Sequence, residues 1–459
     1  MNPDISLIRK YNIPGPRYTS YPTAVQFEEV SKQYGHNSIT DELSLQSDRA
    51  KTRGLSLYFH IPFCFSLCWY CGCTKIITKD SDRGDIYLDY LEMEMDLMRK
   101  HLQPETEVVQ IHFGGGTPTF LRPEQLRRLG TAIHSRFNTG SFTEFSVEID
   151  PRRCTLDHVE ALREIGCNRA SLGVQDTNPD VQEAIHRIQP LEQTAEVTGM
   201  LRVSGINEIN FDLIYGLPRQ TPDTFRQTIE DVMLLSPDRL AVYSYAHIPS
   251  LMPSQKLLDE SEFPSAEMKL NMMVMARESF PDRGMRFIGM DHFAKENDSL
   301  SLALDQGTLQ RNFQGYSTYG GTQMLAFGMS GISQLENAYF QNTKNLAEYY
   351  ETLEKKMLPV VKELRLNRGD KIRKDLIMQV MCQVDVHINH FSDKWDIDFK
   401  TYFKDELSRL DQLEADGLVI HLADRIKITE TGRLFLRNIA MIFDGYLKNS
   451  SQQHFSKTV

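Results

Sequence analysis

The sequence predicts an α/β protein: a partial, TIM-like (β/α)6 barrel, with an N-terminal arm before it and a mostly helical C-terminal domain after it. Three observations support this fold class. Short apolar runs rich in β-branched residues recur between residues 55 and 290, and the segments between them have helical periodicity. Four of the seven cysteines lie together directly after the first of these runs. Beyond about residue 360 the pattern is mainly helical.

The pattern divides the chain into four regions. Residues 12–23 are interrupted by proline and glycine, which excludes a regular helix or central strand. Their tyrosines are nevertheless costly to leave exposed, so this segment is expected to pack across the next region. The predicted regions are an N-terminal arm near the active site (1–50), the barrel core (51–290), an irregular, glycine-rich connector or lid with short helices (291–360) and a helical, winged-helix-like domain (361–459).

The barrel core is predicted from strands that alternate with helices. Residues 85–99, for example, have apolar residues at helical spacing. Six or seven such units suit a partial barrel with parallel strands, in which chemistry gathers at the C-terminal strand ends. The predicted strands are 57–61, 108–113, 145–149, 170–174, 209–214, 240–245 and 287–290.

The C-terminal domain resembles a winged helix in its order of elements. We expect a helix at 404–416, a hairpin from 417–421 and 424–429, and a helix at 432–447. Winged helices often bind DNA, but from residue 360 onward the chain has 16 Lys and Arg against 15 Asp and Glu. Without a basic surface, a structural cap is the better interpretation.

Composition describes an ordinary globular chain, with 41% hydrophobic and 25% charged residues. A net charge of -11 makes neither nucleic acid nor an anionic membrane an expected partner, and an anionic substrate would need a local basic pocket. The first residues lack the apolar segment of a signal peptide, and no run is long enough to span a bilayer. Together with clustered, unpaired cysteines this predicts a cytoplasmic protein.

The cysteine cluster predicts a metal centre. Cys64, Cys68 and Cys71 have the spacing C-x3-C-x2-C, which lets one loop direct three sulfurs at one site. Structural zinc takes four protein ligands, and no second cysteine or histidine pair follows at a suitable distance. A 4Fe-4S cluster prefers thiolates, and three of them leave one iron open. The competing explanations are a zinc site and a group of buried structural cysteines.

Polar residues also follow the predicted strands. The run Gly114, Gly115, Gly116 and Thr117 allows close approach of the backbone to a ligand, but it is neither a dinucleotide fingerprint nor a P-loop. Glu148 is a lone acid inside an apolar strand, which favours a polar partner such as a ribose hydroxyl or an ammonium group. A salt bridge to a neighbouring helix is the alternative.

C-x3-C-x2-C behind a strand resembles the signature of the radical S-adenosylmethionine (SAM) superfamily. That resemblance implies a radical SAM barrel whose open iron chelates the amino and carboxylate groups of SAM. A reduced cluster then breaks the C–S bond and releases a 5'-deoxyadenosyl radical. The cofactors supply the chemistry, and the protein supplies binding and orientation.

Longer motifs throughout the chain are similar to those of the oxygen-independent coproporphyrinogen III oxidase (coproporphyrinogen dehydrogenase) family. The resemblance implies that propionate side chains of coproporphyrinogen III are oxidatively decarboxylated to vinyl groups, giving protoporphyrinogen IX for anaerobic heme synthesis. The matching motifs are residues 17–23, the fourth cysteine in 71–73, and residues 210–218, 287–293 and 311–316.

The same resemblance implies site residues. Cys64, Cys68 and Cys71 match the cluster ligands, whereas Cys73 matches a family cysteine that is not a ligand. Tyr58, Gly115 and Glu148 match positions that hold the cluster-bound SAM. The family binds a second SAM nearby, and its contacts match Tyr70, Gly116, Thr117, Gln175, Arg187, Asp212, Ala246 and Ile332. Two SAM molecules per chain are therefore expected.

Substrate, partners and one alternative complete the expectations. A tetracarboxylate needs arginine donors, and Arg17 and Arg311 stand in family motifs. The resemblance implies a low-potential electron donor, an electron acceptor and a monomer. A heme-binding chaperone of the same fold is the alternative, but close relatives of that type generally lack Cys73 and the motif at 311–316. Within the cysteine loop, Phe65 and Ser66 replace a more polar pair typical of bacterial members.

Overall fold

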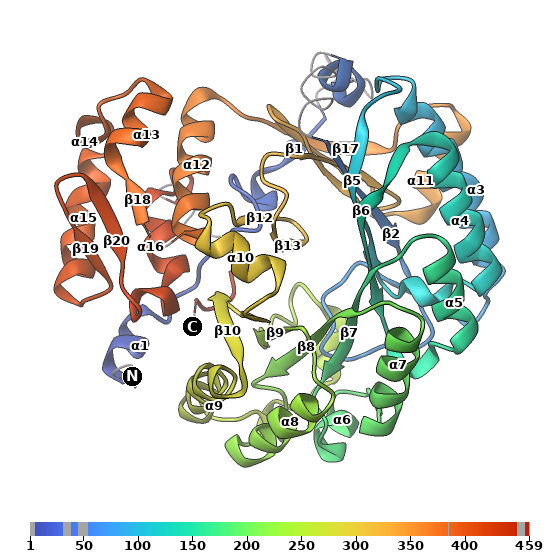
Figure 1. The fold of residues 1–459 in the computed structure, drawn as a ribbon, viewed down its shortest axis with the longest axis horizontal. Helices are drawn as coiled ribbons and strands as arrows, with labels where there is room; N and C mark the ends of the chain where they lie inside the picture. The colour runs from blue at the N-terminus through green and yellow to red at the C-terminus, as the bar shows by residue number, and fades with distance from the viewer. Residues whose placement is uncertain (1–4, 31–37, 45–53, 384, 448–454, 459) are drawn as a thin grey trace.

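The computed structural model describes residues 5–30, 38–44, 54–383, 385–447 and 455–458. Its barrel is a row of parallel strands that neighbour one another in chain order, which confirms the predicted fold class (Figure 1). The strands are β2 (Leu55–Ile61), β5 (Glu107–Gly115), β6 (Asn138–Ile149), β7 (Arg169–Gln175), β8 (Glu208–Tyr215) and β9 (Arg239–Ser244).

Helices connect these strands and cover the outer face of the sheet (Figure 1). Several begin with a proline in the first turn, where its missing N–H costs no hydrogen bond. The connecting helices are α3 (Arg83–Arg99), α4 (Pro123–Arg136), α5 (Leu156–Glu164), α6 (Pro179–Ala184), α7 (Leu191–Val203) and α8 (Pro222–Leu234).

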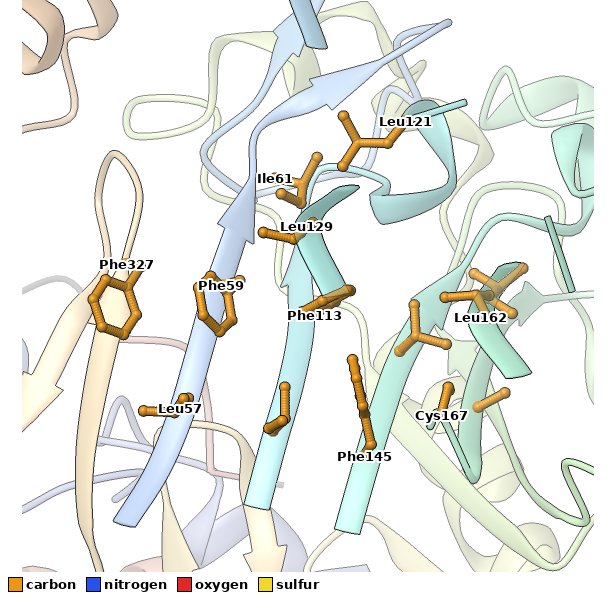
Figure 2. Close-up of a cluster of buried hydrophobic side chains, with 14 of the residues drawn as sticks. Leu57, Phe59, Ile61, Phe113, Leu121, Leu129, Phe145, Leu162, Cys167 and Phe327 are labelled. Atoms are coloured by element: carbon orange, nitrogen blue, oxygen red, sulfur yellow. The ribbon is translucent and has the colours of Figure 1, made fainter. Parts of the chain in front are cut away.

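The main hydrophobic core lies between the strands and these helices, not inside the barrel. On β2 the alternate residues Leu57, Phe59 and Ile61 are fully buried on this outer side (Figure 2). Phe59 stacks on Phe327, with ring centroids 5.0 Å apart, and meets Phe113 edge to face. Because side chains alternate along a strand, the residues between them face the lumen, which is polar.

The seventh predicted strand is part of a hairpin and not of a parallel unit. Strand β10 (Met285–Gly289) pairs antiparallel with β11 (His292–Lys295), and β11 pairs antiparallel with β9. The turn between them has two residues, whereas a parallel connection needs a crossover of a dozen or more. The hairpin therefore ends the parallel row, and six units form the barrel.

The region expected to be an irregular lid with short helices contains strands that extend the same sheet. β14 (Gln323–Phe327) pairs parallel with β2, and further strands continue beyond it. These runs are too short to show a clear period in the sequence. The strands beyond β14 are β15 (Ile332–Gln334), β16 (Ala338–Asn342) and β17 (Val360–Arg365). The region also contains β12 (Gln310–Asn312) and β13 (Gly315–Ser317), which pair with each other, and the helices α10 (Ser299–Asp305) and α11 (Leu346–Glu354).

The C-terminal region confirms the predicted helix, hairpin and helix, although the last helix is shorter than expected. It begins with a 3-10 turn and then forms α16 (Leu436–Phe443). The other elements are α12 (Arg368–Cys382), β18 (Asp385–His387), α13 (Ile388–Trp395), α14 (Phe399–Tyr402), α15 (Lys404–Ala415), β19 (Val419–His421) and β20 (Arg425–Ile428). Among the described residues, no helix is long and apolar enough to cross a membrane.

The N-terminal segment runs from the C-terminal domain to the far edge of the sheet (Figure 1). Helix α1 (Ile5–Tyr11) lies beside the C-terminal domain, and β1 (Glu28–Glu29) pairs with β17. Between them Tyr18 donates a hydrogen bond to Asp444 at 2.9 Å, and Tyr21 accepts one at its carbonyl from Tyr339 at 2.8 Å. Both tyrosines are buried, so this segment is part of the packed structure.

Candidate active site

The cysteine loop begins where β2 ends, at the C-terminal edge of the barrel. Cys64 ends the short strand β3 (Phe63–Cys64), and its sulfur lies 3.4 Å from the Thr117 hydroxyl. The pKa of Cys64 is raised to about 11, mainly by burial and in part by negative charge on Cys71 and Cys68. The three thiols predicted as ligands therefore act on one another electrostatically.

Two guanidinium groups approach the sulfur of Cys68. Arg152 lies 3.4 Å from it and Arg187 lies 3.6 Å from it. Both arginines also bind Asp150, which they hold in its ionised form: burial raises the pKa of Asp150, but Arg187 and Arg152 lower it to about 2. The two guanidinium groups therefore place positive charge directly beside the Cys68 sulfur.

Cys71 and Cys73 are hydrogen-bonded to each other through their thiols. This bond lowers the pKa of Cys71 and raises that of Cys73, so Cys71 is the member that ionises first. Lys75 donates to the Cys71 carbonyl at 3.0 Å. The difference agrees with a ligand role for Cys71 and a supporting role for Cys73.

The glycine run after β5 brings the strand backbone against its neighbours. Gly115 has φ +117°, and a Cβ at Gly116 would lie 2.6 Å from the Pro62 carbonyl oxygen, so neither position has room for a side chain. The Gly115 N–H donates to the Glu148 carboxylate at 3.2 Å. Glu148 is thus tied to the end of the neighbouring strand β5 and not to a helix, and its side chain remains 45% exposed.

Tyr58 and Glu148 meet at His112, a residue that the sequence analysis did not select. The Tyr58 ring stacks on His112 with centroids 5.8 Å apart, and the His112 ring nitrogen Nε2 lies 3.3 Å from Glu148. The signal for His112 was its position, directly before the glycine run and at a lumen-facing place in β5. The structure brings Tyr58, Gly115 and Glu148 together.

A second group of predicted residues lies on the other side of the cysteine loop. Arg187 donates to the Gly173 carbonyl at 2.7 Å, and its charge acts on Tyr70. A Cβ at Gly173 would lie 2.8 Å from the Gln175 amide and 3.1 Å from Arg187, so these side chains cover that glycine. Tyr70, Gln175 and Arg187 therefore form one wall beside Cys68.

The remaining predicted contacts differ in how closely they join this wall. Gln255 donates to the carbonyls of Tyr70 and Ala246, each at 3.1 Å, which links those two residues. Asp212 lies in the lumen on β8, where burial raises its pKa to about 6. Ile332 is separate: its side chain packs with Phe27 and Tyr339 on β15's side of the sheet.

A cavity of about 160 Å³ occupies the lumen between the strands. Glu148, Asp212, Tyr243, His292 and Tyr316 contribute to its lining. Tyr243 and Tyr316 each meet the His292 ring edge to face, at 6.0 and 5.2 Å. Because the side chains come from widely separated strands, this grouping was not visible in the sequence.

The two arginines selected for the substrate both lie beside this cavity. Arg17 lies over the Tyr243 ring at 5.5 Å, and Arg311 lies over the Tyr316 ring at 4.8 Å. Two nitrogens of Arg311 are buried without a hydrogen-bond partner. The pKa of His292 is lowered to about 3, mainly by burial and in part by the charges of Arg311 and Arg17, so this ring is neutral.

Comparison with known proteins identifies the chain. Residues 58–232 match the radical SAM superfamily, and residues 366–435 match the HemN C-terminal domain. An oxygen-independent coproporphyrinogen III oxidase of Pseudomonas aeruginosa is 42% identical, covering 99% of this chain and 98% of that protein. The one of Escherichia coli is 41% identical over the same shares of the two chains.

A solved structure supports the same relationship. The coproporphyrinogen III oxidase (HemN) of Escherichia coli, described as a radical SAM enzyme, matches with a TM-score of 0.91 at 39% identity and covers 97% of this chain and 99% of its own. Fold and cysteine loop thus define a radical SAM enzyme. Within that class the chain belongs to the oxygen-independent coproporphyrinogen III oxidase family.

Membership of this superfamily implies a 4Fe-4S cluster and SAM. Among the described residues, no three His, Cys, Asp or Glu side chains are grouped as ligands of a single metal ion. A cluster binds each thiolate to a different iron, so its ligands need no common point. Three neighbouring thiols, a cationic pair at Cys68 and a glycine run without room for side chains fit a cluster with a bound SAM.

Proposed function

We propose that this protein converts coproporphyrinogen III to protoporphyrinogen IX by oxidative decarboxylation of two propionate side chains. The proposal rests on one observation: the sequence is 42% and 41% identical to two proteins named as oxygen-independent coproporphyrinogen III oxidases, over nearly the whole length of each pair of chains. The lumen supports it, because Arg17 and Arg311 lie over two tyrosines of its lining and two nitrogens of Arg311 lack a hydrogen-bond partner among the described residues.

For each propionate, the C–H bond at the β-carbon breaks and the carboxylate leaves as carbon dioxide, which forms the vinyl double bond. When bound, the cluster and SAM supply the 5'-deoxyadenosyl radical that takes the hydrogen atom. One electron enters from a low-potential donor and one leaves to an acceptor. Two rounds consume two SAM molecules and give two methionines and two 5'-deoxyadenosines.

The chain's own residues bind and orient the reactants. Cys64, Cys68 and Cys71 are the proposed cluster ligands, and the guanidinium groups of Arg152 and Arg187 lie 3.4 and 3.6 Å from the Cys68 sulfur. Tyr58, Gly115 and Glu148 are the proposed contacts of the first SAM. Glu148 is a suitable acceptor for an ammonium or hydroxyl group because it is half exposed and is already oriented by the Gly115 N–H.

A second SAM is proposed beside the first, as in the family. Tyr70, Gln175 and Arg187 form a shared wall next to Cys68, and the backbone of Gly116 and Thr117 joins the cysteine loop there. Asp212 and Ala246 extend this site, whereas Ile332 would have to reach it through its backbone because its side chain packs elsewhere. The protein is proposed to act as a monomer.

Arg17 and Arg311 are proposed to bind carboxylates of the substrate. Alanine at either position should lower the affinity for the substrate or the turnover. If a variant keeps both its affinity and its turnover, the residue that it replaces is not a substrate contact. A heme-binding chaperone receives no support, because the relatives are named as oxidases and Cys73 and the motif at residues 311–316 are both present.

The test is an anaerobic assay of iron-reconstituted protein with coproporphyrinogen III, SAM, a reductant and an electron acceptor. We expect protoporphyrinogen and 5'-deoxyadenosine in a ratio of one to two, and neither product with Cys68→Ala. If a cluster forms, the substrate is unchanged and heme binds tightly, the chaperone function replaces this proposal.

A further inference from the structure

A second cavity lies outside the lumen, on the opposite face of β9. Val242 and Ser244 line it, whereas the alternate residues Ala241 and Tyr243 line the lumen. Helix α9 (Ala266–Ser279) and the C-terminal domain close the cavity, whose volume is about 50 Å³. Among its described lining residues Asp291 is the single acid, against the four cations Arg17, Arg277, Arg433 and Arg437.

Arg277 is the least compensated of these cations. Its guanidinium lies 3.9 Å from the centre of the Phe287 ring, and its Nη1 atom is buried without a hydrogen-bond partner. The pKa of Arg277 is lowered to about 10, mainly by burial and in part by the charge of Arg433. A buried cation that lacks an anionic partner is costly, so this position is suited to bind an anion.

Arg433 lies on the same aromatic ring, 5.0 Å from the centre of Phe287. One of its nitrogens donates to the carbonyls of Phe287 and Ile288, at 2.8 and 3.1 Å. The nearest acid, Glu430, is 3.6 Å away and 70% exposed, so it neutralises little of the charge inside the cavity. Arg277 and Arg433 are thus held in place against Phe287, and most of their positive charge is available to bind an anion in the cavity.

Arg17 connects this cavity with the lumen. It lines the cavity, while its guanidinium lies over Tyr243, which lines the lumen. Its pairing with Asp291 is loose, at 3.7 Å, and the buried Asp291 Oδ2 accepts no hydrogen bond. An incoming carboxylate can therefore replace Asp291 as the partner of Arg17 without breaking a hydrogen bond.

We propose that this cavity binds one carboxylate of the porphyrinogen substrate, and that Arg277 and Arg433 are the residues that bind it. The assignment rests on the proposed function. The volume of about 50 Å³ corresponds to about three to five water-sized groups, at roughly 10–15 Å³ each, which suits a carboxylate. Arginine forks bind carboxylates in bidentate geometry. Because the cavity lies behind β9, the bound propionate is one that is not at the reacting centre.

The test compares two probes that differ in charge. The affinity of anaerobically reconstituted protein is measured for coproporphyrin III, the oxidised tetracarboxylate, and for its tetramethyl ester. We expect Arg277→Met and Arg433→Met each to weaken tetracarboxylate binding about tenfold and to leave ester binding unchanged. Arg277→Lys should retain only part of the affinity, because it keeps the charge but loses the bidentate fork. KM for coproporphyrinogen III should rise while kcat changes little, as expected for binding made equally in ground and transition states.

Arg286→Met is the matched control, because Arg286 adjoins Phe287 in sequence but pairs with the exposed Asp305. If the acid and the ester are weakened equally, or if both methionine variants bind the acid as the wild type does, the cavity has only a structural role. Should Arg277→Met fail to fold, the acid and ester affinities of Arg277→Lys and Arg433→Met test whether the cavity binds a carboxylate. A wild type that does not convert coproporphyrinogen III rejects the proposed function instead.

Discussion

Glu94 shows how one buried group sets a pH dependence. It is fully buried, and its hydrogen-bond partners among the described residues are uncharged: the Gly328 N–H, the Tyr349 hydroxyl and the Asn342 amide each donate to it at 2.7 Å. Burial raises its pKa from 4.5 to about 7, and these hydrogen bonds lower it only in part. The carboxyl joins helix α3 to the strands beyond β14.

This shift predicts how stability changes with pH. Between pH 4.5 and 7 the folded protein keeps a proton on Glu94 that the unfolded chain has lost, so the free energy of unfolding falls as pH rises. The loss is about 3 kcal/mol and is complete above pH 7. Glu94→Gln should flatten this part of the profile, measured by urea unfolding, whereas the exposed control Glu278→Gln should not. An unchanged slope in Glu94→Gln would show that another group causes it.

The four clustered cysteines are expected to divide into three ligands and one supporting residue. Cys71→Ala should lose most of the iron and the visible absorption of anaerobically reconstituted protein, because a thiolate ligand is gone. Cys73→Ala should keep both, since its thiol only hydrogen-bonds Cys71. Iron analysis and absorption spectra of the two variants measure how much of the cluster each one retains. Equal loss in the two variants would make Cys73 a fourth ligand.

At the scale of elements, the end of β5 is built for close backbone contact. The Gly116 N–H donates to the Ile61 carbonyl at 2.8 Å, and Thr117 N–H donates to that of Phe63 at 2.9 Å. These bonds fix the glycine run against the cysteine loop. A strand end and a loop that are far apart in the sequence thereby form one surface for a ligand.

Gly116→Ala should disrupt this surface. The added Cβ would lie 2.6 Å from the backbone oxygen of Pro62, so the strand end must move. We expect SAM affinity to fall at least tenfold, with a destabilisation of roughly 1–3 kcal/mol. Equilibrium dialysis and thermal unfolding measure the two effects. Gly140→Ala is the control, because its Cβ would make an ordinary 3.6 Å contact with Glu107; equal SAM affinity in both variants contradicts the argument.

At the scale of the whole molecule, Arg437 joins the two ends of the chain. From α16 its guanidinium donates to the carbonyls of Gly15 and Pro16 in the N-terminal arm and to those of Ser456 and Lys457. It is 6% exposed and has backbone oxygens as partners. The arm, the C-terminal domain and the terminal residues are thus held by one side chain.

Arg437→Met should release the arm. Leaving several buried carbonyls without a donor costs roughly 2–4 kcal/mol, and the arm should become sensitive to limited proteolysis while the barrel stays resistant. Cleavage sites and rates measure this effect. Arg409→Met is the control, because Arg409 donates to the carbonyls of Met441 and Ile442 in the last turn of α16 and not to the arm. If both variants are cleaved alike, Arg437 does not hold the arm.

The sequence by itself determined the family, the cysteine loop and the row of parallel strands. These are local properties: the spacing of Cys64, Cys68 and Cys71 and the period of each strand can be read within a few residues. The helix and hairpin of the C-terminal domain were predicted for the same reason.

Tertiary structure decided what depends on contacts between distant segments. The pairing of β11 with β9, the extra strands around β14 and the polar lumen require contacts between segments that are far apart in the sequence. Only folding brings Arg17 beside Arg277 and Arg433, and only folding separates Ile332 from the other predicted SAM contacts. A linear pattern specifies which face of a strand is apolar, but the partner that each face meets is fixed by the packing of the whole chain.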